Sequence, residues 1–359
     1  MKKFGLVIST SFALFSMFFG SGNLVFPITV GKFSEGNYFL AALGILLTGV
    51  LVPFLGLFGM FLHQGSIPNF FRFLGKTGTF LFAFLALALL GPFGVVARCL
   101  TVAHGAIQLL IPSASLMITS IVLSVAIYLF TVNKFKIISV LGVWLTPILL
   151  LAIGVIAFFG LRGGIAESAA SHGWEVFKNG FFQGYQTMDL LAAFFFSTFV
   201  IKQLKGDVKI FLKSSAIAAV ILAAVYLALV VLGWAYAPLL GEVLPQEMLG
   251  RIAIAALGPF AAPCVCIAVL LACLTTAITL AILFSDFLRT EILRDKISYK
   301  SSLILTLVIG ILVSTLEFSG IAKFLGPLLE MVYPALISLT LVNIGLSIRQ
   351  KGGDSLKYG

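Results

Sequence analysis

The fold is decided by the stretch FFGSGNLVFP, residues 18–27, which lies in an apolar run that is otherwise long enough to cross a membrane. Inside a helix, glycine costs about 1 kcal/mol and proline about 3 kcal/mol relative to alanine, so Gly20, Gly22 and Pro27 all oppose a continuous helix here. Ser21 and Asn23 add polar side chains at the same depth. The stretch therefore predicts a membrane helix that is broken near the centre of the bilayer.

The composition of the 359-residue chain excludes a soluble globular protein. Hydrophobic residues make up 60% of the chain and charged residues 10%, and the mean hydropathy is +1.16. Apolar stretches of about 20 residues recur along the chain, without the two-residue alternation of membrane strands. The sequence therefore predicts an all-α integral membrane protein that contacts the lipid bilayer. The formal charge of +10 comes mainly from bases in loops, so we expect no nucleic acid partner.

The apolar pattern predicts about ten transmembrane helices within a single transport domain over residues 1–359. Most Lys and Arg residues fall in loops on one side of the expected spans, and the positive-inside rule makes that side cytoplasmic. Both termini are then expected in the cytoplasm. The expected spans are approximately 5–30, 38–62, 78–110, 114–132, 137–161, 180–201, 214–237, 262–288, 301–316 and 323–348.

A second interrupted run, NGFFQGYQTMDLLAAFFF at residues 179–196, begins the sixth span, five helices after the first. This spacing is typical of two inverted five-helix repeats, here approximately 5–161 and 180–348, each opening with a discontinuous helix. The backbone groups freed by such breaks must face protein, water or a ligand. Free N–H groups favour an anion and free carbonyls favour a cation, so the pattern predicts a site for an amino acid zwitterion with sodium.

Each polar feature also has a structural interpretation. The glycines of the first break can serve close helix packing. Asp189 can mark a transport pathway, pair with Arg98 or cap the second half of its helix, and Arg98 can extend to the outer headgroups instead. Thr275 and Thr276, in ACLTTAITLAILFSDFL at residues 272–288, can bind a cation or return hydrogen bonds to the preceding turn.

The chain resembles the branched-chain amino acid carrier family of bacteria, whose members import leucine, isoleucine and valine with sodium. The resemblance rests on FALFSMFFGSGNLVFPITVG at 12–31, GPFGVVARCLTVAHG at 91–105, NGFFQGYQTMDLLAAFFF at 179–196 and YPALISL at 333–339. It implies the leucine-transporter fold of the amino acid, polyamine and organocation superfamily, with helices 1 and 6 discontinuous and alternating access around a site between them. It also implies a bacterial plasma membrane location, sodium as coupling ion without another cofactor, and methionine as a further candidate substrate.

The same resemblance assigns the substrate site to the two breaks. The N–H groups of Gly20, Ser21 and Gly22 are expected to receive the substrate carboxylate, with Asn23 close to it or to an ion. The second break is expected to complete the site, and its Tyr185 is expected to line the pocket for an apolar side chain. The residues expected from this break are Gly184, Tyr185, Gln186, Thr187 and Asp189.

The resemblance also assigns a sodium site. The hydroxyls of Thr275 and Thr276 are expected to coordinate the ion, and backbone carbonyls are expected to complete its shell. These carbonyls belong to Ser16, Phe19 and Ala272.

Two features depart from the family pattern. Members usually have twelve helices, whereas this sequence ends after the tenth expected span with RQKGGDSLKYG at 349–359, so the final pair is expected to be missing. Glu330 places a carboxylate in the tenth span, where a neutral residue is expected. It could be a proton site, a partner for a base or a residue facing a water-filled vestibule, and the sequence does not rank these.

The leading hypothesis is sodium-driven uptake of branched-chain or similar apolar amino acids, and not an enzyme activity. A proton-coupled transporter that uses Asp189 or Glu330 is the alternative. An intramembrane enzyme is less favoured, because the sequence shows neither acids at metal-ligand spacing nor a nucleophile with a base. A passive channel would repeat a polar face along several helices, whereas polarity here is concentrated at one depth. The sequence leaves the oligomeric state open.

Overall fold

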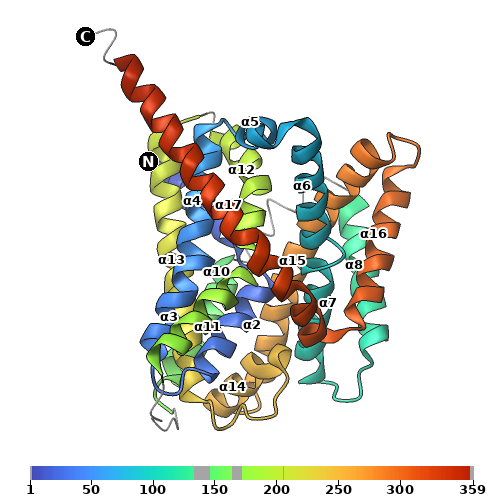
Figure 1. Ribbon diagram of the computed structural model, residues 1–359. Helices are drawn as coiled ribbons and strands as arrows, with labels where there is room; N and C mark the ends of the chain where they lie inside the picture. Colours follow the sequence, from blue (N-terminus) through green and yellow to red (C-terminus); the bar gives the residue numbers. More distant parts are fainter. Residues whose placement is uncertain (1, 133–145, 164–171, 205, 356–359) are drawn as a thin grey trace.

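The computed structural model describes residues 2–132, 146–163, 172–204 and 206–355, and no β-strand occurs among them. The helices form one bundle in which most of them run roughly along a common direction (Figure 1). The start of α1 and the end of α17 lie toward the same end of this bundle (Figure 1). The all-α prediction is confirmed for the described part of the chain.

The first predicted break is present. Helix α1 (Lys2–Phe18) and helix α2 (Ser21–Lys32) meet at an angle of 71°, and the chain between them is extended at Gly20, with φ −118° and ψ −162°. Pro27 lies inside α2, in the second turn after the break. The small residues at 20–22 therefore end one helix and start another within a single span, as their backbone energetics predict.

The second predicted break is also present. Helix α11 (Gly173–Tyr185) ends three residues before helix α12 (Asp189–Leu204) begins. Between them Met188 has a φ of 60°, in the left-handed region that interrupts a right-handed helix. Helix α11 begins at Gly173, earlier than the predicted span at 180, so the first half of this span is longer than its apolar run.

The other helices overlap the predicted ranges, except four short elements that lie between them, namely Ile67–Phe70, Arg72–Leu74, Pro245–Glu247 and Met248–Leu257. Among the described residues, five segments are long and apolar enough to cross a membrane, and the bent α1–α2 pair makes a sixth. The five are Tyr38–Leu62, Arg72–Gln108, Val208–Ala235, Ala261–Ile292 and Glu317–Arg349. Every predicted range contains a helix, although residues 137–145 of the fifth lie outside the described residues. The total of ten spans therefore stays a prediction.

The bounds of the elements not yet named follow in chain order. They are α3 (Tyr38–Leu46), η1 (Leu47–Leu51), α4 (Val52–Leu62), α5 (Ile67–Phe70), η2 (Arg72–Leu74), α6 (Gly75–Leu90), α7 (Val95–Gln108), α8 (Leu116–Val132), α10 (Thr146–Gly160), α13 (Val208–Ala235), η4 (Pro245–Glu247), α14 (Met248–Leu257), α15 (Ala261–Phe287), η5 (Leu288–Ile292), α16 (Tyr299–Ser314) and α17 (Glu317–Ser355).

Glycines bring the broken helices into backbone contact with their neighbours. A Cβ at Gly31 of α2 would lie 1.9 Å from the carbonyl oxygen of Val230 in α13, and one at Gly233 of α13 would lie 2.1 Å from that of Ile28 in α2. A Cβ at Gly180 of α11 would likewise clash with the backbone of α3. Small residues at these contacts let membrane helices approach closely.

This packing places the two breaks against each other. Helices α1 and α2 pack on α13, whereas α11 packs on α3 and α12 packs on α4. The first broken span thus contacts the seventh, and the sixth contacts the second. Two inverted repeats would produce this reciprocal arrangement, and the bounds of the repeats stay a prediction.

Candidate functional site

Three buried polar side chains, those of Asn23, Asp189 and Tyr226, join the two helix breaks. Nδ2 of Asn23 donates to Oδ2 of Asp189 over 2.7 Å and also to the Tyr226 hydroxyl. The Tyr226 hydroxyl donates to the same carboxylate oxygen over 3.1 Å. None of the three is more than 3% exposed. The cluster therefore links α2, α12 and α13 beside the points where both spans are interrupted.

The first turn of α2 faces this cluster. The N–H of Gly20 donates to Oδ1 of Asn23 over 2.9 Å. The N–H groups of Ser21 and Gly22 lie in the first helical turn, where a helix supplies no acceptor. The hydroxyl of Ser21 accepts a weak hydrogen bond from Sγ of Cys99 over 3.4 Å. The positive end of the α2 dipole is therefore directed at the site and suits a carboxylate.

A central cavity of about 20 Å³ lies between the two breaks. This is room for about one water molecule. Apolar side chains of Leu90, Phe196 and Leu280 form part of its wall, and Arg98 also lines it. The predicted substrate residues that line it are Gly20, Ser21, Gly22, Asn23, Thr187 and Asp189. A helix N-terminus, a guanidinium and a carboxylate therefore border one small cavity with an apolar side.

Arg98 of α7 forms its hydrogen bonds with Gln186 in the second break and not with Asp189. Its Nη1 donates to the backbone oxygen of Gln186 over 2.6 Å, and its Nη2 donates to Oε1 of Gln186 over 2.7 Å. The guanidinium carbon lies 5.1 Å from the ring centroid of Phe26 and 5.5 Å from that of Phe318, which is within cation–π range. Arg98 is 1% exposed, so it does not extend to the headgroups.

Gln186 carries this connection on to α17. Its Nε2 donates to the backbone oxygen of Ala322 over 3.3 Å. Because Phe318 also lies on α17, the arginine and the glutamine together join α7, the second break and the beginning of α17. Gln186 therefore holds the structure around the cavity, and it is not among the residues that line the cavity.

Two other residues of the second break also lie away from the cavity. A Cβ at Gly184 would lie 2.0 Å from Oγ1 of Thr48, so Gly184 permits close packing on η1. The ring of Tyr185 lies 4.5 Å from that of Tyr333 and 5.3 Å from that of Phe181. Tyr185 thus packs between α11 and α17 in this structure. Roles of Gly184, Tyr185 and Gln186 in substrate binding stay predictions.

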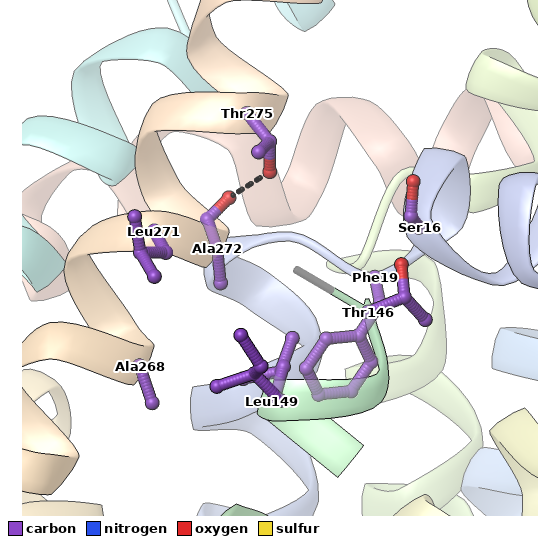
Figure 2. Close-up of a pocket in the computed structure, with 9 residues that line it drawn as sticks. Ser16, Phe19, Thr146, Leu149, Ala268, Leu271, Ala272 and Thr275 are labelled. Carbon is purple, nitrogen blue, oxygen red and sulfur yellow. Dashed lines mark hydrogen bonds between the residues drawn. The ribbon is translucent and has the colours of Figure 1, made fainter. Parts of the chain in front are cut away.

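A second cavity, also of about 20 Å³, lies where the sodium site is expected. Ser16 and Phe19 line it from the first span, and Ala272 and Thr275 line it from α15. Figure 2 shows the Thr275 hydroxyl directed at the Ala272 carbonyl, to which it donates over 3.0 Å, with Ser16 and Thr146 across the cavity. Four of the five predicted sodium residues therefore surround one space of about the size of a single water molecule or ion.

Thr276, the fifth predicted sodium residue, lines the central cavity instead. It is 7% exposed, and its hydroxyl has no hydrogen-bond partner among the described residues. A Cβ at Gly20 would lie 3.2 Å from this hydroxyl oxygen, so the threonine is adjacent to the first break. A buried hydroxyl without a partner carries a desolvation cost, which a cation or a polar ligand would relieve.

The sequence did not predict that four further residues contribute to the two sites, namely Tyr226, Thr146, Phe26 and Phe318. Tyr226 and Thr146 stand among apolar residues, and no motif marks them as site residues. The two phenylalanines act through Arg98, whose neighbours depend on tertiary structure. A single polar side chain deep in an otherwise apolar span is the one signal that could have singled out Tyr226.

Glu330 lies outside both cavities. Its side chain is exposed on α17, just before the stretch YPALISL at 333–339, and it lines neither cavity. This position leaves Asp189 as the buried carboxylate of the central site.

The chain is similar to known transport proteins along most of its length. A family of branched-chain amino acid transport proteins matches residues 4–352. The branched-chain amino acid permease BrnQ of Bacillus subtilis is 31% identical over 352 residues, covering 93% of this chain and 79% of the permease. A putative branched-chain amino acid carrier protein of Staphylococcus aureus is 30% identical over 360 residues, covering 92% of this chain and 80% of the carrier. The matched range 4–352 contains both breaks and the residues that line both cavities.

Two solved transporters share the fold. Mhp1, a nucleobase-cation-symport-1 family transporter in a closed conformation with bromovinylhydantoin bound, aligns with a TM-score of 0.62 at 16% identity, covering 92% of this chain and 77% of Mhp1. MhsT in complex with L-phenylalanine aligns with a TM-score of 0.59 at 16% identity, covering 87% of this chain and 78% of MhsT. The chain is therefore a multi-pass membrane transporter with the leucine-transporter fold, and it belongs to the branched-chain amino acid transport family.

Proposed function

We propose that the protein imports leucine, isoleucine, valine and similar apolar amino acids such as methionine, by sodium symport with alternating access. The observation that carries the proposal is the convergence of Ser16, Phe19, Ala272 and Thr275 on one small cavity beside the first break. The proposal places the protein in a bacterial plasma membrane with both termini in the cytoplasm. No other cofactor is part of the proposal.

The substrate is proposed to bind between the two breaks. Its carboxylate would meet the N–H groups of Ser21 and Gly22 at the start of α2, where the helix dipole favours an anion. Its ammonium group would meet Asp189, whose described partners are the neutral side chains of Asn23 and Tyr226. Its apolar side chain would displace side chains of the cavity wall such as Leu90 and Phe196, because the cavity of about 20 Å³ is too small for an amino acid.

The sodium ion is proposed to bind between α1 and α15. Sodium is a hard cation that prefers oxygen ligands, and this cavity combines backbone carbonyls with the hydroxyls of Ser16 and Thr275. The neighbouring Thr276 hydroxyl lacks a partner and faces the central cavity. Adjacent residues of α15 thus border the two cavities, which gives the ion and the substrate a shared structural element.

A proton-coupled transporter is the second candidate, and Asp189 is the observation that favours it. The carboxylate is 3% exposed and receives hydrogen bonds from the neutral side chains of Asn23 and Tyr226. A buried carboxylate without a basic partner is suited to bind a proton.

Uptake into proteoliposomes separates these functions. Labelled leucine, isoleucine, valine and methionine are supplied with an inward sodium gradient, with an inward proton gradient or with neither. Accumulation that requires the sodium gradient supports the proposal, whereas accumulation that requires only the proton gradient supports the second candidate. If none of the four amino acids accumulates under either gradient, the proposed substrate class is wrong.

A further inference from the structure

Arg98 is a buried cation whose described partners are uncharged. The side chain is 1% exposed, and it donates hydrogen bonds to the backbone oxygen and to Oε1 of Gln186. Its Nε has no hydrogen-bond partner among the described residues. A buried charge is costly unless an opposite charge compensates it, and a charged residue inside a membrane usually marks a functional site. The guanidinium therefore has a positive charge and one N–H donor available for an anion.

The guanidinium of Arg98 lies against the first turn of α2. Cys99, the next residue of α7, donates to the hydroxyl of Ser21. The guanidinium carbon is 5.1 Å from the ring centroid of Phe26, and a Cβ at Gly22 would lie 3.2 Å from the same ring. Arg98, Ser21 and Gly22 all line the central cavity. A carboxylate beside the N–H groups of this first turn is therefore next to the guanidinium as well.

The partner of Arg98 lies where the two breaks touch. A Cβ at Gly22 would lie 3.5 Å from Cα of Thr187, and Thr187 directly follows Gln186. The two acceptor oxygens of Gln186 are neutral, whereas a carboxylate offers the guanidinium two charged oxygens in a matching planar geometry. A carboxylate in the cavity therefore competes with Gln186 for Arg98 and forms the stronger bonds.

Two of the side chains that line the central cavity are ionisable, and they carry opposite charges. These are Arg98 and Asp189, and the hydrogen bonds described for each of them go to neutral groups. An α-amino acid zwitterion brings a carboxylate and an ammonium group, so it can compensate both charges at once. An amine or a simple carboxylic acid compensates only one and leaves the other buried charge unpaired, which is the basis of strong discrimination.

From this arrangement we infer that Arg98 determines the specificity for the carboxylate of the substrate. When an amino acid binds, the guanidinium exchanges the oxygens of Gln186 for the substrate carboxylate, which also accepts from the N–H groups of Ser21 and Gly22. The inference rests on the proposed function and adds to it the residue that selects amino acids over amines.

The aromatic neighbours of Arg98 and its bonds to Gln186 give the exchange a structural consequence. The rings of Phe26 and Phe318, at 5.1 and 5.5 Å from the guanidinium carbon, keep the cation in place whichever oxygens it binds. The exchange removes two hydrogen bonds between α7 and the second break. Gln186 then retains its bond to the backbone oxygen of Ala322. Recognition of the carboxylate thereby loosens α7 from the second broken span.

Competition by two analogues of leucine tests the inference. Leucinamide keeps the ammonium group and carries a neutral amide in place of the carboxylate, whereas isocaproate keeps the carboxylate and lacks the ammonium group. Each analogue competes with labelled leucine for sodium-dependent binding to the purified protein. The readout is the inhibition constant of each analogue divided by that of leucine, because a general loss of stability does not change this ratio.

Arg98→Gln removes the charge and is expected to lower the leucinamide ratio at least about tenfold, because leucine loses a charged, forked hydrogen bond that the amide never had. The isocaproate ratio should stay the same, since isocaproate and leucine lose the same contact. Asp189→Asn is the matched variant and should show the reverse pattern, with a lower isocaproate ratio only. An unchanged leucinamide ratio in Arg98→Gln overturns the inference.

Two substitutions of Gln186 test the exchange without altering Arg98, and they decide the question if Arg98→Gln fails to fold or to bind leucine. Gln186→Glu gives the guanidinium a carboxylate within the protein, so we expect leucine binding to weaken at least about tenfold. Gln186→Met is the control, because it also loses the bond to Ala322 but offers no competing oxygen on its side chain. It should bind leucine more tightly than the parent. Equal leucine binding by the two variants would show that Arg98 serves structure alone, and the inference would be wrong.

The parent chain separates a failure of this inference from a failure of the proposed function. Sodium-dependent uptake of leucine by the parent supports the proposed function whatever the variants of Arg98 and Gln186 do. If the parent takes up leucine but binds leucinamide equally well, only the inference about Arg98 is wrong. If the parent accumulates no leucine under a sodium gradient, the proposed function is wrong and the inference falls with it.

Discussion

Asn23 and Asp189 are 166 positions apart in the chain and are joined by a hydrogen bond of 2.7 Å from Nδ2 to Oδ2. Asn23 lies in the first turn of α2 and Asp189 is the first residue of α12, so the bond connects the starts of two helix segments that follow the two breaks. Tyr226 of α13 donates to the same carboxylate oxygen. A ligand that binds Asp189 would therefore act on both broken spans at once.

Asp189→Asn tests the charge of this carboxylate. The amide has nearly the same shape, but it lacks the charge proposed to bind the substrate ammonium group. Hydrogen bonds to charged groups contribute about 1.5–3 kcal/mol, so we expect leucine uptake at low substrate concentration to fall about 10- to 100-fold. Tyr226→Phe keeps the charge of the carboxylate and removes one of its hydrogen bonds, so it should lower uptake less than Asp189→Asn does. Equal uptake by Asp189→Asn and the parent chain, at matched protein levels, would exclude Asp189 from the site.

Thr275→Ala and Thr276→Ala test the sodium site. Removal of either hydroxyl is expected to raise the sodium concentration for half-maximal uptake by about tenfold, because a hydroxyl bound to a charged partner contributes about 1.5–3 kcal/mol. Thr279→Ala is the matched control. Its hydroxyl donates to the backbone oxygen of Thr275 one turn away and lines neither cavity. A sodium dependence that is the same in all three variants would remove the threonine pair from the proposed site.

Arg98→Lys tests whether Arg98 acts through its geometry or only through its charge. Lysine keeps the positive charge but cannot bind the backbone oxygen and Oε1 of Gln186 with one planar group. We expect this variant to lose about 1–3 kcal/mol of stability, measured as a lower Tm in detergent, and to transport leucine more slowly. Gln186→Glu should raise the Tm of the Arg98→Lys variant, because it gives the lysine a charged acceptor in place of the neutral amide oxygen. A lysine variant with parental Tm and uptake would show that the charge alone is needed.

Gly184→Ala tests whether Gly184 serves packing or substrate binding. The added Cβ would lie 2.0 Å from Oγ1 of Thr48, so we expect a loss of about 1–3 kcal/mol of stability, as is typical of overpacked interiors. In the double variant with Thr48→Ala this clash is absent, and part of the lost Tm should return. Gly345→Ala, on α17 with no atom near its Cβ position, is the control and should leave the Tm unchanged or slightly higher. A normal Tm with impaired leucine binding would instead favour a direct role of Gly184 at the substrate.

The breaks were predictable because their causes are local. Glycine and proline change the free energy of a helix wherever they occur, so Gly20, Gly22 and Pro27 carried the information within ten residues of sequence. The five-helix spacing between the two interrupted runs then indicated where the second half of the site lies. The small residues that line the central cavity followed from the same local pattern.

The partners of Arg98 and Asp189 were not predictable in the same way. Sequence alone offered pairing of these two residues or extension of Arg98 to the headgroups, whereas the structure pairs Arg98 with Gln186 and Asp189 with Asn23 and Tyr226. These choices depend on how α7 and α13 pack beside the breaks, which no short stretch of sequence encodes.

The contact between Gly31 and Gly233 has a consequence for how the site opens. With virtual Cβ atoms only 1.9 and 2.1 Å from the opposite backbones, α2 and α13 interlock too tightly to slide past each other. Helix α11 is held to α3 in the same manner through Gly180. Each broken span is thus tethered to a full-length companion, and the alternation of access should proceed by rocking of these paired bodies about the breaks rather than by a swing of one half-helix alone.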